Sequence, residues 1–163
     1  MTETLPEEIT EVERTLDAPR FGTVTYRDSE VLTFPWGMPG FNHLRRFLAL
    51  SLESQSGFVW LQSIEEPNIA LPTSDPFSLF PDYAPRLPGY AVSSLELGDP
   101  DSFVTLCVVV VTAGAETMTM NLLAPIVVNL ETRSARQVTL EGSQYSVREP
   151  IPRTAPAPAA PAA

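Results

Sequence analysis

The side chains that could support catalysis are few and scattered along the chain. One histidine, His43, and one cysteine, Cys107, occur among 163 residues. This supply is too small for an ordinary His/Cys zinc site. His43 stands beside two arginines after a glycine-containing loop, which favours a surface residue over a catalytic base. Cys107 lies in an apolar run, which favours an inert core thiol over a reactive one, and a lone cysteine excludes an internal disulfide.

Paired carboxylates also occur, at Glu65–Glu66 and at Asp99 with Asp101. Both pairs stand beside proline in predicted turns, where solvated carboxylates keep their ordinary acidity and make poor general acids. The chain contains no Gly-x-Ser-x-Gly, phosphate-binding loop or dinucleotide fingerprint. We therefore expect a binding protein that is not an enzyme and has no cofactor or metal.

Charge sets limits on the partners of the chain. Twenty acidic residues face ten arginines and no lysine, which gives a net charge of −10. Such a balance repels phosphate backbones, so we expect no direct binding of nucleic acid. It either attracts basic protein partners or does no more than keep the protein soluble.

The amino end is acidic and lacks the basic region and apolar run of a secretory signal. The apolar run at 103–112 is about half the length that a bilayer requires. We expect a cytoplasmic protein that does not bind membranes and is a monomer when free.

The elements expected around these residues are mainly strands. In residues 103–112, the side chains that would point to either face of a strand are apolar or β-branched. This pattern predicts a central strand that is covered on both faces. After a break at 113–115, Met118, Met120 and Leu122 alternate with polar residues, as in a strand with one dry face. Pro125 has no N–H to donate to a neighbouring strand, so it predicts a bulge or an edge. The apolar face of the strand then resumes at Ile126.

Short strands and turns fill most of the remaining chain. A five-residue polar turn between 47–52 and 58–64 predicts a β-hairpin. Further strands are expected at 21–26, 31–34, 69–73 and 136–141, and 92–97 fits either a short strand or a helical turn. The predicted fold is all-β, a small antiparallel β-barrel-like single domain with long Pro-rich loops.

Two loops are rich in proline and aromatic residues. Residues 34–41, FPWGMPGF, form either a rigid plug at one end of the core or an exposed hydrophobic docking site. Residues 69–90 contain five prolines and are expected to cross the surface mostly as an ordered loop, which is often functional in a small domain.

The two ends differ from the middle. Residues 1–20 hold six acids against two arginines and form either a solvated acidic arm or, over 5–16, a short helix. The folded domain is expected over 21–149. The Pro/Ala tail at 150–163 has too few large apolar groups to offset an ordering cost of about 1–2 kcal/mol per residue, so we expect it to be disordered.

Three motifs together resemble those of a known family. Residues 34–41 resemble an FPxGIPGF element, 75–83 resemble NPFxxFPDY, and 121–129, NLLAPIVVN, are similar to NLxAPIVIN. Their order and spacing, and a closing segment at 137–150, resemble the flagellar assembly factor FliW family over about 21–151. Asp75 departs from the asparagine usual in the family, which adds a charge and affects a turn cap.

The resemblance implies a non-catalytic β protein that binds flagellin in the cytoplasm. It also implies binding of CsrA, a dimeric RNA-binding translational repressor, which the factor antagonises allosterically so that flagellin translation follows secretion. The candidate partner-binding residues are Asp75, Phe77, Phe80, Asp82, Tyr83, Asn121 and Asn129. Each also has a structural interpretation, because aspartates and asparagines cap turns and aromatic side chains seal cores.

A different class of function is a small-molecule-binding β-barrel without catalytic activity. The pair Met118 and Met120 suggests an adaptable apolar interior, although core packing explains these residues more simply. An internal hollow large enough for a ligand would distinguish the two.

Overall fold

The structure is a computed structural model, and it describes residues 12–52, 57–111 and 117–152. Residues 53–56 of the predicted turn at 53–57, the break at 113–115 and most of the expected tail lie outside the described residues. Among the described residues, no helix is long and apolar enough to cross a bilayer. The strands are β1 Glu13–Ala18, β2 Gly22–Arg27, β3 Val31–Thr33, β4 Arg46–Leu50, β5 Val59–Ser63, β6 Ala70–Ser74, β7 Phe103–Val111, β8 Met118–Met120, β9 Ile126–Asn129, β10 Ala135–Gln137 and β11 Glu149–Pro150, and the helices are α1 Pro76–Leu79 and α2 Gly89–Ser94.

The strands confirm the predicted antiparallel all-β class. One sheet follows the order β10-β9-β7-β6-β5-β4-β3, with β8 also paired to β7 and β11 paired to β8, and β1 and β2 form a separate hairpin. The sheet curves until its ends meet at one parallel bridge between Thr33 and Ser134, where Thr33 N donates to Arg133 O at 2.9 Å. A single bridge is not a continuous ladder, so the sheet is barrel-like and not a closed barrel.

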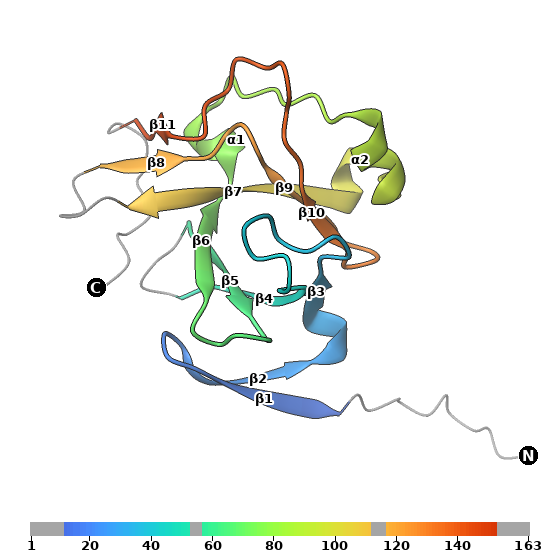
Figure 1. Ribbon diagram of the computed structural model, residues 1–163, viewed down its shortest axis with the longest axis vertical. Coiled ribbons are helices and arrows are strands. Elements are labelled where there is room, and N and C mark those ends of the chain that lie inside the picture. Colours follow the sequence, from blue (N-terminus) through green and yellow to red (C-terminus); the bar gives the residue numbers. More distant parts are fainter. Residues whose placement is uncertain (1–11, 53–56, 112–116, 153–163) are drawn as a thin grey trace, which may run out of the picture.

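Strand β7 is the central strand, as predicted (Figure 1). It pairs with β9 through Phe103–Leu106, with β8 through Val109–Val111 and with β6 at Cys107 and Val108. Pro125 lies between β8 and β9, at the interruption that its missing N–H predicts. The expectation that this strand is buried on both faces is wrong at Val104 and Val110, which are 39% and 50% exposed. Strand β9 is instead the one that is buried on both faces, since all four of its residues are buried.

Alternation along β9 divides the interior into two cores. Val127 packs into an upper core above β7, whereas Ile126 and Val128 pack into a central core below it (Figure 1). Burying a large aliphatic or aromatic side chain contributes about 1.5–3 kcal/mol, so these two cores supply most of the driving force for folding. The predicted inward side chains Val138 and Leu140 lie in the upper core.

The amino-terminal segment differs from the expected arm or helix. Strand β1 pairs along its whole length with β2, and its buried residues Leu16 and Ala18 pack with Tyr26 and Leu48 in a third, lower core. The domain therefore begins at or before Glu13, not at 21, while residues 1–11 lie outside the described chain. The apolar spacing that suggested a helix is overridden because Leu16 and Ala18 share one face of a strand.

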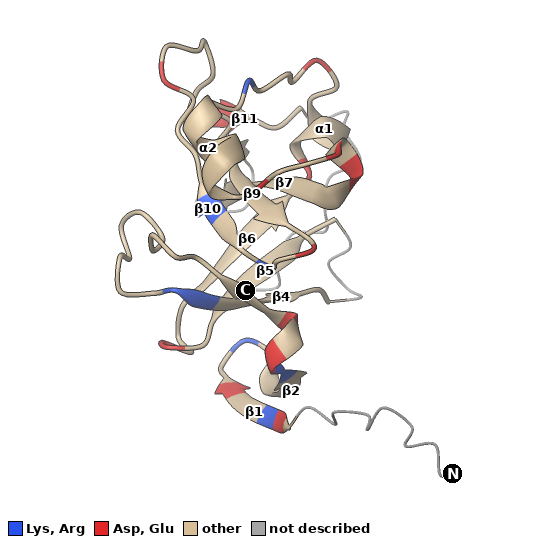
Figure 2. Ribbon diagram, turned by 90° about the vertical axis from the view of Figure 1, so that its right-hand side faces the viewer, with Lys and Arg blue, Asp and Glu red and all other residues tan. Residues whose placement is uncertain are grey.

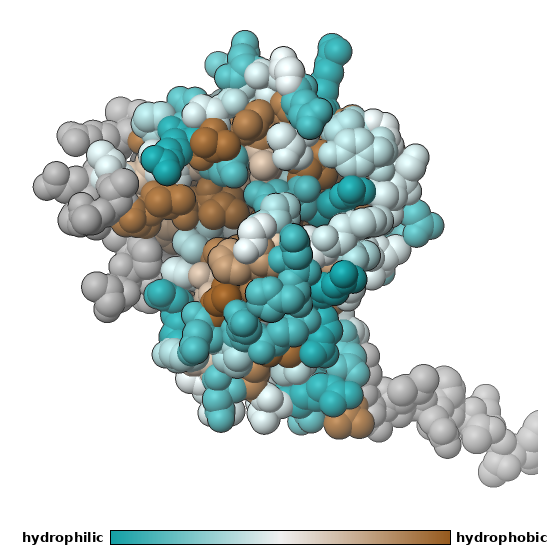
Figure 3. Space-filling view, viewed as in Figure 1, coloured by the Kyte–Doolittle hydropathy of each residue, from teal (hydrophilic) through white to brown (hydrophobic). Residues whose placement is uncertain are grey.

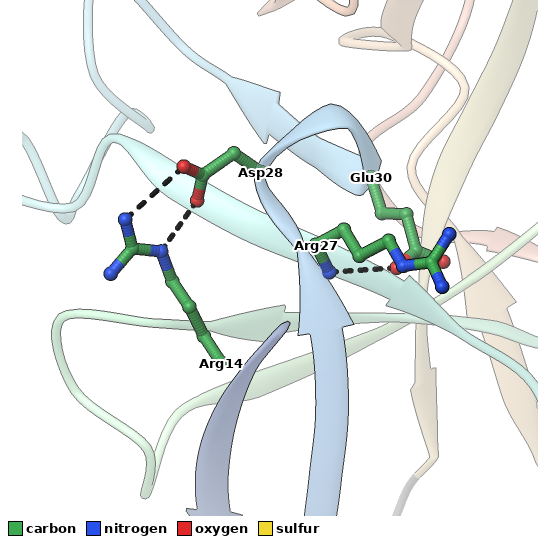
Figure 4. A network of polar contacts seen from close by, with 4 residues as sticks. All are labelled: Arg14, Arg27, Asp28 and Glu30. Carbon is green, nitrogen blue, oxygen red and sulfur yellow. Dashed lines mark hydrogen bonds and ion pairs between the residues drawn. The ribbon is translucent and has the colours of Figure 1, made fainter. Parts of the chain in front are cut away.

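Polar contacts join this hairpin to the 3₁₀ turn Asp28–Glu30 (Figure 4). Arg14 Nε donates to Asp28 Oδ1 at 2.7 Å, and the pair holds the pKa of the Asp28 carboxyl below its ordinary value. The Glu30 carboxylate accepts from Arg27 N at 2.8 Å. These groups are exposed, so they fix the local geometry more than they add to stability.

The Pro-rich segment after β6 is more helical than predicted. Helix α1 begins at Pro76 and helix α2 at Gly89, and both lie above β7 (Figure 1). Proline suits the first helical turn because its missing N–H would have no helical partner there. Between the helices the chain follows the surface as an ordered loop, in line with the prediction.

The loop at 34–41 has a buried part and an exposed part. Phe34 and Met38 are buried in the central core, while Trp36 is 47% exposed. Gly37 has φ +76°, and a Cβ built there would lie 2.5 Å from the backbone oxygen of Asn42. Gly40 also has a positive φ, of +88°, but open space around it. The tight turn at Gly37 is what returns Met38 to the core.

These two glycines provide a matched test of that turn. Both Gly37→Ala and Gly40→Ala incur about 1–2 kcal/mol for a left-handed backbone. Gly37→Ala adds a backbone overlap, for which we expect a further loss of about 1–3 kcal/mol. Urea unfolding measures both variants, and equal midpoints for the two would contradict the close approach to Asn42.

Candidate protein-docking surface

Of the residues that could support catalysis, His43 and the Glu65–Glu66 pair are neighbours, whereas Cys107 lies in the upper core. His43 is exposed and its Nε2 lies 3.1 Å from Glu66 Oε1, while the neighbouring Glu65 carboxylate accepts from the backbone N–H groups of Arg45 and Arg46. Both glutamates thus fix a turn. Across residues 12–52, 57–111 and 117–152, no group of three potential metal ligands occurs.

Asp75 and Phe77 have distinct roles at the start of α1. Asp75 Oδ1 accepts from Phe77 N and Asp75 Oδ2 accepts from Ser78 Oγ, both at 2.9 Å, which is an N-cap. This cap holds the first turn of α1 and leaves the Phe77 side chain 44% exposed. Asp75 positions the helix, and Phe77 presents apolar surface.

Tyr83 anchors the rest of the loop to the strands. Its side chain is 5% exposed, and its hydroxyl donates to the backbone oxygen of Leu122 at 2.7 Å. Its ring packs against Tyr145 at 4.7 Å and Phe77 at 5.6 Å, between ring centroids. Tyr83 therefore supports Phe77 from below.

Phe80 and Asp82 flank this anchor at the surface. Phe80 is half-buried and Asp82 is exposed, and with Tyr83 and Leu122 they line a hollow of about 360 Å³. Five of the seven candidate residues, from Asp75 to Tyr83, thus lie on one continuous stretch of surface or directly beneath it.

The two candidate asparagines are part of the framework. Asn129 is 3% exposed, its Nδ2 donates to the backbone oxygens of Leu95 and Glu96, and its Oδ1 accepts from two backbone N–H groups of the turn that follows β9. The Oδ1 of Asn121 accepts from Ala124 N at 3.0 Å and shapes the bend before Pro125. Asn129 ties α2 to β9 and is inaccessible to a partner.

An apolar groove of about 580 Å³ lies next to Phe77, and sequence reasoning missed it. It forms because the Asp75–Pro76 cap turns the chain into α1, so β6 pairs with β7 at Cys107 and Val108 and then leaves the sheet. The groove opens where the missing strand would continue. Its walls are Leu32, Ala49, Val59, Asp75, Phe77, Pro100, Phe103, Val104, Thr105, Leu106, Val128, Leu130 and Arg133.

A second exposed aromatic surface joins the loop at 34–41 to α2. The Arg136 guanidinium lies between the rings of Trp36 and Tyr90, at 4.3 and 4.8 Å from their centroids, and its Nη1 donates to Ser94 Oγ. Such stacking contributes about 0.5–1 kcal/mol at exposed sites, which explains why Trp36 points outward. This face of the molecule is the one that Figure 3 shows, with apolar residues gathered over β7 and β8.

The two methionines that suggested a ligand-binding interior belong to the packing of the upper core. Met120 is fully buried, and Met118 packs against the same core from its edge. The groove beside Phe77 lies instead against the first part of β7, at Phe103, Val104, Thr105 and Leu106.

Cys107 is fully buried beneath Tyr83. Burial raises the pKa of the Cys107 thiol to about 12. Burial also raises the pKa of Tyr83, with the neighbouring Cys107 as a further cause. The inert core thiol expected from the sequence agrees with this environment.

Comparison with known proteins identifies relatives along nearly the whole described chain. Residues 15–151 match the sequence family described as "FliW protein". The chain is 32% identical to the flagellar assembly factor FliW of Clostridium tetani, over 83% of this chain and 94% of that protein. It is 39% identical to the FliW of Pseudothermotoga lettingae, over 79% and 83% of the two chains. A crystal structure of the flagellar assembly factor FliW superposes with a TM-score of 0.81 at 27% identity, covering 86% of this chain and 99% of that one.

The framework role of Asn129 is open to a direct test. Asn129→Ala removes four hydrogen bonds and strands the buried Leu95 carbonyl, so we expect a loss of roughly 2–4 kcal/mol in the free energy of unfolding. Asn121→Ala, which removes one hydrogen bond, is the control with a loss of about 1 kcal/mol. Urea unfolding measures both, and similar losses would rule out the tie between α2 and β9.

Burial of Cys107 predicts a stability change at alkaline pH. The folded thiol stays protonated up to a pKa of about 12, whereas the unfolded thiol ionises near pH 8.5. Stability from this group is complete below pH 8.5 and falls as pH rises toward 12, by up to about 1.4 kcal/mol per pH unit. Urea unfolding from pH 8 to 11 should show a shallower decline in Cys107→Ser than in the original chain. Parallel curves would show that the thiol does not contribute.

Proposed function

Because the chain belongs to the FliW family of flagellar assembly factors, we propose that it binds flagellin in the cytoplasm and antagonises the translational repressor CsrA. It does so without catalysis. When flagellin is exported, the free factor binds CsrA and lifts repression of flagellin translation. When flagellin accumulates, it occupies the factor and repression returns. Such a switch requires two protein partners that cannot bind the factor together.

The observation that carries this proposal is the match over residues 15–151, combined with a rigid surface at the motif that follows β6. Phe77 is exposed, yet its position is fixed by the Asp75 cap below it and by the ring of Tyr83. A partner that docks on a preorganised aromatic side chain loses little conformational entropy at the interface. Exposed aromatic side chains of this kind commonly dominate the energy of protein interfaces.

Within this proposal the seven candidate residues divide by exposure. Phe77 and Asp82 are exposed and contact the partner directly, with half-buried Phe80 beside them. Asp75 contributes charge and holds α1. Tyr83, Asn121 and Asn129 act indirectly, because their polar atoms are engaged with the backbone.

Binding and RNA release test the function together. We expect the purified chain to form complexes with flagellin monomers and with CsrA on size-exclusion chromatography, and to release a flagellin leader RNA from CsrA. Added flagellin should reverse that release. A chain that binds neither protein would refute the proposal.

Single substitutions test the surface. Phe77→Ala should weaken flagellin binding at least tenfold, measured by calorimetry, because a central aromatic contact is worth more than about 1.4 kcal/mol. Tyr90→Ala is the matched control, since Tyr90 is 50% exposed on α2 and away from this motif. The opposite ranking would place the interface on the face of Trp36 and Arg136.

A further inference from the structure

One edge of strand β7 has no partner over its first residues. Successive residues of a strand direct their backbone N–H and C=O groups to opposite edges. The carbonyl of Val108 accepts from Asn121 N on the β8 side, so the odd-numbered residues of β7 face β6 instead. Strand β6 pairs with Val108 and Cys107 and goes no further. In the part of the chain that the structure describes, the N–H and C=O groups of Phe103 and Thr105 therefore have no partner at this edge.

A proline explains why β6 ends its pairing here. Ser74 pairs with Cys107, so in the same antiparallel register the residue opposite Thr105 would be Pro76. Pro76 has no N–H, and its carbonyl accepts from Phe80 N at 2.8 Å at the end of α1. Neither backbone group of Pro76 is available to Thr105. The sequence itself therefore leaves this edge of the sheet open.

The open edge, formed by the backbone of Phe103 and Thr105, runs along the apolar groove of about 580 Å³, and both residues line that groove. Val104 and Leu106 also line it, and they share the parity of Val108, which packs against the central core. A chain paired at the open edge would therefore direct every second side chain toward the groove walls that β3, β4 and β5 supply. Unpaired backbone groups and an apolar hollow thus lie where one extended segment reaches both.

Four exposed carboxylates adjoin the groove. One lines it, two flank its wall residue Pro100 and one follows its wall residue Leu130. They belong to Asp75, Asp99, Asp101 and Glu131. In Figure 2, acidic positions lie near α1 and in the turn between β9 and β10. Arg133 also lines the groove, but its Nε and Nη2 donate to the backbone oxygens of Ser29 and Glu30. The rim is therefore acidic, which opposes edge-to-edge pairing of two copies of this chain and favours a segment with cationic side chains.

From this geometry we propose that an extended segment of a partner protein adds to β7 as a new strand along Phe103–Leu106. The new strand is antiparallel, as is each strand that pairs with β7. Its apolar side chains, at alternate positions, enter the groove, and lysine or arginine at the positions between them pairs with the acidic rim. Hydrogen bonds to the open edge supply affinity for an extended backbone, and the groove and rim select the sequence. This binding mode goes beyond the proposed function and depends on neither of its two partners.

Amide hydrogen exchange in the free protein tests whether the edge is open. The N–H of Thr105 has no partner, whereas the N–H of the next residue, Leu106, faces β9, where Leu106 pairs with Ile126. We expect the Thr105 amide to exchange at least tenfold faster than the Leu106 amide, measured by NMR. Equal protection of these two amides in the free monomer would overturn the proposal.

A short synthetic peptide that alternates valine with lysine and has blocked ends is the probe for strand addition. Two N-methylated versions of it keep every side chain and every charge. In an antiparallel pair, the residues that bond to Phe103 and Thr105 are those whose side chains point away from the groove, which are the lysines. Methylation of the lysine amides should therefore weaken binding at least tenfold by calorimetry, while methylation of the valine amides should leave it within about twofold. Equal affinities for the two methylated peptides would overturn the proposal.

Substitutions in β7 locate the site on the protein. Val104→Arg places a cation in the groove and should weaken binding of the valine–lysine peptide at least tenfold. Val110→Arg is the matched control, because Val110 lies on the same strand, has the same parity and is 50% exposed, but does not line the groove. It should leave peptide binding unchanged. If circular dichroism shows that Val104→Arg does not fold, Asp99→Asn with Asp101→Asn tests the rim, and should weaken peptide binding several-fold in low salt but not in high salt.

Other results would also overturn the proposal. The unmodified peptide should bind and should slow exchange of the Thr105 amide, so failure of either expectation removes strand addition at this edge. Normal peptide binding by folded Val104→Arg would place the peptide outside the groove, and a rim variant that binds normally in low salt would remove the acids from recognition. Sedimentation of the free chain as a dimer that Val104→Arg converts to a monomer would assign the edge to a second copy of the chain.

Discussion

The pairing of β7 is the constraint on which the rest of the structure depends. This strand is hydrogen-bonded to β6 on one edge and to β8 and β9 on the other, so it connects the part of the sheet formed early in the chain to the part formed late. Its two faces contribute to different cores, with Cys107 and Val109 above and Val108 below. Each interruption beside β7 has a proline as its cause. Pro125 separates β8 from β9, and Pro76 ends the pairing of β6 by starting α1.

The motif residues of the sequence include some that build the framework and some that lie at the surface. Asn129 and Tyr83 are buried polar side chains that bond to backbone atoms 34 and 39 residues away. Buried polar groups of this kind specify one arrangement of the loops, because any other arrangement leaves a donor or acceptor unsatisfied. Phe77 is exposed because this framework holds it there. A binding surface made of loops can therefore be rigid although it contains little regular structure.

The elements that sequence reasoning predicted correctly are those determined by local pattern. The hairpin of β4 and β5, the central strand and the interruption at Pro125 all follow from alternation and from the properties of proline. Strand β1 was missed because its acids and its helical spacing were the local signal, whereas its burial depends on Tyr26 and Leu48, which come later in the chain. The groove was missed for a similar reason. Its walls come from seven separate segments, among them Leu32 and Val104, which are far apart in the sequence.

The bridge between Thr33 and Ser134 has a consequence for how the protein is made. The backbone N–H of Thr33 donates to the carbonyl of Arg133, which is synthesised a hundred residues later. At a synthesis rate of about 5–20 residues per second, this interval lasts roughly 5–20 seconds on the ribosome. The groove has the same requirement, because Leu32 and Ala49 meet Val128 and Leu130 there. A nascent chain consequently lacks the assembled groove until residues 128–133 have emerged.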